Sequence, residues 1–94
     1  PDDPARRDQL ASAQHGLATG HLASGRLVDA VEAFRRSAEL REAILRDSPE
    51  DNEKRRAVVV ALGNVGDVLG ARTGENLGDH AGAVAAFERA VAIS

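Results

Sequence analysis

A short pattern of small and apolar residues occurs twice in this chain, and it constrains the fold more than any other feature. Each copy places an Ala five residues after a Gly, and a Phe four residues after that Ala. The two copies are Gly25, Ala30 and Phe34, then Gly78, Ala83 and Phe87. The two Phe residues are the only Phe, Tyr or Trp in the chain. A pattern repeated in this way indicates a structural unit that is used twice.

Apolar residues recur at spacings of three and four along most of the chain, which is the period of one helix face. This predicts four helices, at about 4–24, 27–47, 49–71 and 80–93. The expected fold class is all-α, because an Ala-rich chain with few aromatic residues suits closely packed helices better than strands. A length of 94 residues allows a single domain over 1–94.

Capping residues mark the expected helix ends. The N-caps predicted for the first, third and fourth helices are Asp3, Ser48 and Asp79. Pro49 suits the first position of the third helix, where its missing N–H costs nothing. Gly25 ends the first helix because it is free to adopt a positive φ.

One face of each helix is predicted to pack on its neighbours. Gly16 and Gly20 weaken the first helix by about 1 kcal/mol each relative to Ala, and we expect them to allow close approach of a neighbouring helix. The apolar faces are Leu10, Ala13, Leu17, Ala18 and His21; then Leu27, Ala30, Val31, Phe34, Ala38, the stem of Arg41, and Leu45; then Ala57, Val58, Ala61, Leu62, Val65 and Leu69; then Ala83, Val84, Phe87, Ala90 and Val91.

The first and third helices also match each other. At a separation of 45 residues, Leu17 aligns with Leu62 and Ala18 with Gly63, whereas the second and fourth helices align at a separation of 53. The difference is an insertion near 71–78. The chain is therefore expected to be helix–turn–helix twice, with repeat 1 at about 4–47 and repeat 2 at about 49–94.

These residues resemble the tetratricopeptide repeat family. The matching positions are Leu17, Gly25, Ala30 and Phe34 in the first hairpin, and Leu62, Gly63, Gly78, Ala83, Phe87 and Ala90 in the second. The resemblance implies an α-solenoid, in which small residues let two helices approach and each Phe fills the space between hairpins. Two features depart from the family: Gln14 and Val59 replace an early aromatic residue, and Glu42 replaces a closing Pro. The long period and the loop at 76–79 are similar to repeat arrays that follow bacterial serine/threonine protein kinase domains.

The resemblance also implies a protein or peptide partner, bound on a concave surface lined by the first helix of each repeat. The corresponding positions are His15, Thr19, Leu22, Val60, Asn64 and Asp67. Asn64 stands where the family often has an Asn that bonds the ligand backbone. The basic residues that clamp a terminal carboxylate are missing, so that specificity is not expected. The alternative is that these six residues are simply solvent-facing helix positions.

Composition and spacing argue against several other functions. A net charge of −3 is unsuited to a general nucleic-acid surface, and the apolar runs are far shorter than the roughly 20 residues of a membrane helix. The absence of Cys excludes thiolate metal sites and fits a cytoplasmic protein. His15 and His21 are six residues apart and do not share a helix face. The glycines of 63–70 match neither of the two phosphate-binding motifs, GxGxxG and Walker A. We therefore predict no catalytic residue, cofactor or metal, and no enzyme.

Two repeats are fewer than the three or so that such arrays usually need. The chain starts at Pro1 and stops within an apolar pattern, so we expect a piece of a longer protein. An apolar strip of Val84, Val91 and Ile93 is expected to be exposed unless a further repeat or self-association covers it.

Two functions fit this sequence. The first is a non-catalytic module that binds a protein or peptide on its concave face. The alternative is a structural, spacer or oligomerisation segment of a larger bacterial signalling protein, such as a serine/threonine kinase. A groove with clustered polar donors favours the first, whereas a groove filled by its own side chains or by a second copy favours the second.

Overall fold

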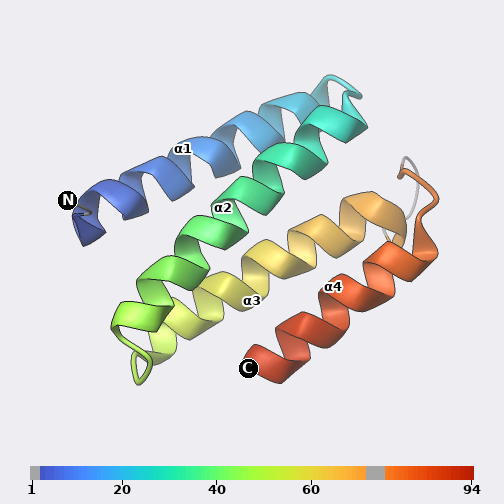
Figure 1. Ribbon diagram of the computed structural model, residues 1–94. Coiled ribbons are helices and arrows are strands. Elements are labelled where there is room, and N and C mark those ends of the chain that lie inside the picture. The colour runs from blue at the N-terminus through green and yellow to red at the C-terminus, as the bar shows by residue number, and fades with distance from the viewer. Residues whose placement is uncertain (1–2, 72–75) are drawn as a thin grey trace.

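The computed structural model describes residues 3–71 and 76–94, and its regular elements within these ranges are all helices. They are α1 (Pro4–Ala23), α2 (Leu27–Asp47), α3 (Asn52–Gly66), the π-helix η1 (Asp67–Ala71), which continues α3, and α4 (His80–Ile93) (Figure 1). The all-α prediction is confirmed, and the predicted bounds match closely except at the start of the third helix. Residues 72–75 of the predicted loop lie outside the described residues.

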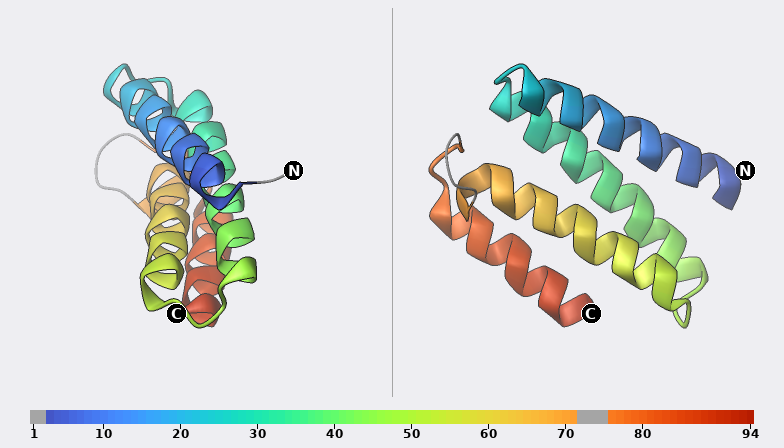
Figure 2. Two further views of the ribbon diagram at one scale, coloured as in Figure 1. Left: turned by 90° about the vertical axis from the view of Figure 1, so that its left-hand side faces the viewer. Right: turned by 180° about the vertical axis from the view of Figure 1, so that it is seen from behind.

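Consecutive helices run antiparallel, so α1 with α2 and α3 with α4 form two hairpins (Figure 1). The hairpins meet where α2 packs on α3, and α1 packs on α2 alone among the described helices. In the right-hand view of Figure 2, α2 lies between α1 and α3. Two hairpins joined through their middle helices leave one face of α1 and one face of α4 without a neighbour.

Two clusters of small and branched side chains form the core. The first core cluster contains Ala18, Ala30, Val31, Ala33, Phe34, Val65, Val68, Leu69, Ala83 and Ala86. The second core cluster contains Ala38, Val58, Ala61, Leu62 and Ala90. The inner faces predicted for the second and third helices are largely confirmed. Ala33, Ser37 and Ile44 are also buried, although they were not predicted.

Three glycines were expected to lie where a neighbouring helix approaches closely, and this prediction is wrong. A Cβ placed on Gly16, Gly20 or Gly63 would meet no atom of the described residues within 4 Å. A Cβ on Gly66 would instead lie 2.8 Å from the Phe87 ring. The buried counterpart of Ala18 in the second hairpin is therefore Gly66 rather than Gly63. When the two hairpins are aligned by these buried residues, α3 follows α1 at a separation of 48 residues instead of the predicted 45.

The predicted apolar face of α1 is mostly uncovered. Ala18 is buried, but Leu10, Ala13 and Leu17 are exposed, because α2 covers a different side of the helix. Leu17 and Leu62, which the sequence aligns, thus differ in environment: Leu62 is buried.

On α4 the predicted inner face is divided. Ala83 and Ala90 are buried and Phe87 is half-buried, whereas Val84 and Val91 are exposed. The expected apolar strip is confirmed at these two valines, while Ile93 packs against the second core cluster. An inward position for Val84 and Val91 is wrong for this chain, since no described element covers them.

The third helix begins later than predicted. Ser48 does not cap it: the Asp51 N–H donates to the Ser48 carbonyl at 3.0 Å, which closes a turn. Asp51 is the N-cap, and its side chain accepts from the N–H groups of Glu53 and Lys54. The caps predicted at Asp3 and Asp79 are confirmed by hydrogen bonds to helix N–H groups.

Candidate functional site

A groove runs between α1 and α3, with α2 as its floor. It consists of two adjoining hollows of about 450 Å³ and about 430 Å³. Both are lined by Arg41, Glu53 and Ala57, so they form one continuous depression. The first hollow is also lined by Ala5, Asp8, Ile44, Asp51 and Lys54, and the second by His15, Ser37, Arg56, Val60, Ala61 and Asn64.

Ser37 lies at the floor of the second hollow. Only 1% of this residue is exposed, and its Oγ has no hydrogen-bond partner among residues 3–71 and 76–94. A buried hydroxyl without a partner costs about 1–3 kcal/mol, so native proteins seldom retain one without a reason. The Oγ is itself inaccessible from the hollow, so a ligand group could supply the missing hydrogen bond only after the side chains that cover it move aside.

His15 forms the α1 side of the same hollow. Its ring lies edge-on to the buried Phe34 ring, with centroids 5.6 Å apart and an interplanar angle of 65°. The residue is otherwise exposed, so His15 offers a hydrogen-bonding group at the α1 edge of the hollow.

The α3 side combines apolar and polar side chains. Val60 is exposed and Ala57 is half-buried, while Asn64 is half-buried and Arg56 is exposed. An Asn side chain can both donate and accept, as a peptide group does. This wall could therefore bond an extended backbone and also contact small apolar side chains.

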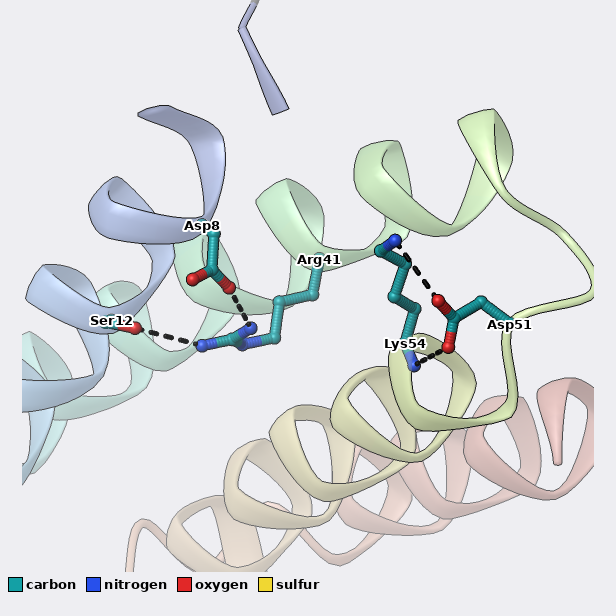
Figure 3. Close-up of polar contacts among 5 residues, drawn as sticks. All are labelled: Asp8, Ser12, Arg41, Asp51 and Lys54. Carbon is teal, nitrogen blue, oxygen red and sulfur yellow. Dashed lines mark hydrogen bonds and ion pairs between the residues drawn. The ribbon is translucent and has the colours of Figure 1, made fainter. Parts of the chain in front are cut away.

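Arg41 fixes the spacing of α1 from α2 beside the groove (Figure 3). Its guanidinium donates to Asp8 Oδ1 at 3.1 Å and to Ser12 Oγ at 3.2 Å, and both acceptors are on α1. The side chain predicted as an apolar stem therefore also makes polar contacts between helices. Arg41 lines both hollows.

Asp51 and Lys54 form the end of the groove where α3 begins (Figure 3). Lys54 Nζ lies 3.2 Å from Asp51 Oδ2, and the Lys54 N–H donates to Asp51 Oδ1. The side-chain bond from Lys54, followed by the backbone N–H bonds, lowers the pKa of Asp51. The carboxylate at this end is thus occupied in holding the first turn of α3.

Three of the six predicted binding residues meet in the groove: His15, Val60 and Asn64. Thr19 is exposed and its hydroxyl donates to the His15 carbonyl, and Asp67 is exposed at the start of η1. Leu22 packs against the first core cluster instead of lining the hollow.

Ser37, Arg41, Glu53 and Arg56 also line the second hollow but were not among the predicted binding residues. For Ser37 the sequence carried a signal, namely a hydroxyl in the middle of an otherwise apolar helix stripe. Arg56 and Glu53 gave none, because charged residues on a helix normally mark a solvated face.

A larger hollow of about 640 Å³ lies on the other side of the α1–α2 hairpin, lined among others by Leu10, Gln14 and Leu40. An ion pair of 2.7 Å between Arg7 and Asp47 crosses from one helix to the other there. None of the six predicted binding residues lines this hollow, and its lining comes from one hairpin. The groove is the better candidate site because both hairpins contribute to it.

Within residues 3–71 and 76–94, no three or more His, Asp or Glu side chains gather as they would around a metal ion. None of the helices in these ranges combines the length and apolar character needed to cross a membrane. Comparisons of the chain with protein-family models, with curated proteins and with solved structures found no match.

Proposed function

We propose that this chain is a non-catalytic, tetratricopeptide-like binding module that holds an extended segment of a protein or peptide in the groove between α1 and α3. The observation that carries this proposal is the Ser37 hydroxyl, which is buried without a partner at the floor between His15 and Asn64. A bound peptide that displaces the side chains over this hydroxyl would give it the hydrogen bond that it lacks in the described structure.

An extended peptide suits the chemistry of the groove. Each of its residues carries an N–H and a C=O, which the Asn64 amide and the Ser37 hydroxyl can bond. Val60 and Ala57 provide apolar contact, and Glu53 and Arg56 supply charges of both signs at the edge. The two joined hollows allow more than one residue of such a peptide to be held.

Binding is favoured over catalysis by the surroundings of Ser37. A Ser nucleophile needs a general base within hydrogen-bond reach. In the described part of the chain, Ser37 Oγ has no hydrogen-bond partner, so nothing there activates it. We propose that the hydroxyl recognises a ligand and does not attack one.

The test is selection from a peptide library on the immobilised chain, followed by calorimetric titration of the selected peptide. Asn64→Ala is expected to weaken binding about tenfold, the effect of one lost hydrogen bond of about 1.4 kcal/mol. Glu88→Ala, on an exposed position of α4 outside the groove, is the matched control and should bind as the native chain does.

The Ser37→Ala variant distinguishes an effect on peptide affinity from an effect on the stability of the fold. Removing an unpaired buried hydroxyl should raise the free energy of unfolding by about 1 kcal/mol, whereas the affinity for the peptide should fall. A damaged fold would lower both quantities. Native affinity in both the Asn64 and the Ser37 variants would show that the peptide binds elsewhere.

A second candidate function is self-association, as a structural or spacer segment of a larger bacterial signalling protein. The exposed Val84 and Val91, about two turns apart on one side of α4, favour it, since apolar surface left uncovered on one side of a helix suits an interface. Under either function we propose a protein partner and a cytoplasmic location. The acidic net charge of −3 disfavours a general role in nucleic-acid binding.

A further inference from the structure

The second and fourth helices occupy equivalent places in the two hairpins. The faces that they turn away from the first helix of their own hairpin differ in burial. Val31 and Ala38 of α2 are 5% and 3% exposed. Val84 and Val91, 53 residues later, are 53% and 73% exposed. The positions that α3 covers on α2 are therefore still apolar on α4, where nothing described covers them. We call Val84 and Val91 the tail surface.

The first and third helices show the opposite mismatch. The burial of Ala18 and Gly66 sets their separation at 48 residues. At that separation, three residues of α1 correspond to three α3 residues that are buried in the contact with α2. Leu10 corresponds to Val58, Ala13 to Ala61, and Leu17 to Val65. Leu10 and Leu17 are 46% and 54% exposed. We call Leu10, Ala13 and Leu17 the head surface.

The contact between α2 and α3 shows how two such surfaces fit. Ala38 shares the second core cluster with Val58 and Ala61, and Val31 shares the first with Val65. The corresponding pairs would be Val91 with Leu10 and Ala13, and Val84 with Leu17. The head surface and the tail surface are thus the two halves of an interface that the molecule already forms internally between α3 and α2.

We propose that a second copy of this chain docks head to tail, with its α1 head surface on the α4 tail surface of the first copy. This inference rests on the second candidate function, self-association, and names the surface that covers α4. The open space around Gly20 lets the α1 backbone approach α4 closely near Val84. Because head and tail are different surfaces, each added copy leaves one of each free, and association can continue beyond a dimer.

The experiment follows the mass of the chain by analytical ultracentrifugation from micromolar to millimolar concentration. The tail variant combines Val84→Glu with Val91→Glu, and the head variant combines Leu10→Glu with Leu17→Glu. Ala85→Glu and Gln9→Glu each add one negative charge at an exposed position of the same helices, off the two surfaces, and serve as controls. Circular dichroism checks that each variant keeps its helices, as expected for substitutions at exposed positions.

The native chain and both controls should increase in mass beyond a dimer, while the head variant and the tail variant alone should stay monomeric. A mixture of the two variants should form a 1:1 dimer and no larger species, because it retains a single intact pair of surfaces. Dimers of the head variant would overturn the role of α1 but leave self-association through α4 standing. A native chain that stays monomeric would overturn both.

Discussion

Two glycines three positions apart on α3 have different roles. Gly63 faces open space, whereas Gly66 lies under the ring of Phe87, which rests against the helix where a side chain would otherwise project. Both look alike in the sequence, as glycines within a helix. The hairpin between α3 and α4 depends on the second of them, because Phe87 can pack closely only against bare backbone.

Alanine substitutions should separate these two glycines. Gly63→Ala is expected to raise the free energy of unfolding by about 0.5–1 kcal/mol, since Ala restricts the unfolded chain and favours helix. Gly66→Ala should lower it by about 1–3 kcal/mol, because the added methyl group overlaps the Phe87 ring. Urea unfolding followed by circular dichroism measures both. Equal effects of the two substitutions would contradict the placement of Phe87.

At the scale of elements, the ends of α3 are set by residues outside its regular part. The Asp51 carboxylate caps the first turn, where it also lies near the positive end of the helix dipole. At the other end, the Asp79 N–H donates to the Leu69 carbonyl at 2.7 Å and the Leu77 N–H to the Val68 carbonyl at 2.9 Å. The residues before α4 thus bond the final carbonyls of the η1 turn, which ties the loop to the helix.

The cap at Asp51 predicts how acid affects stability. Folding lowers the pKa of Asp51, mainly through the side-chain bond from Lys54. The ionised carboxylate therefore stabilises the folded chain above the unfolded-state pKa, about pH 4. This contribution is lost as the pH falls through the lower, folded-state pKa.

Asp51→Asn retains the oxygen acceptor and removes the charge, so it isolates this effect. The native chain should have a higher urea midpoint than the variant at pH 7, and the gap should narrow below about pH 4. A gap that is the same at neutral and acidic pH would show that the charge of Asp51 does not stabilise α3.

At the scale of the whole molecule, the position of α1 creates two separate surfaces. Among the described helices α1 packs on α2 alone. Its side nearer α3 therefore opens into the groove, and another side presents Leu10, Ala13 and Leu17. The groove is lined from α1 by Ala5, Asp8 and His15, which are different residues. The proposed peptide groove and the proposed head surface would therefore use different faces of α1.

These two activities should be independent of each other. The tail variant, Val84→Glu with Val91→Glu, is expected to bind the selected peptide with the native Kd, although it no longer associates. Calorimetric titration at concentrations where the native chain is monomeric provides the comparison. A tenfold weaker Kd in this variant would indicate that a neighbouring copy helps to form the groove.

The local signals in the sequence determined the helices themselves. Apolar spacing located α1, α2 and α4, and Asp3, Gly25 and Asp79 marked their ends, because a capping residue acts on its own first turn and a positive-φ glycine on its own last turn. The repeated Gly–Ala–Phe pattern also placed Ala30, Phe34 and Ala83 in the interior correctly. Such features depend on neighbours a few residues away, so a single sequence contains them.

Only the tertiary structure decided which apolar faces are covered and which polar groups meet. Leu17 and Val65 have similar surroundings in sequence, yet one is exposed and the other buried, because burial depends on whether another helix lies opposite. The contacts of Arg41 with Asp8 and of Glu42 with Arg89 join distant parts of the chain in the same way. Ser37 became a candidate binding residue only when the fold placed it between α1 and α3, without a partner for its hydroxyl.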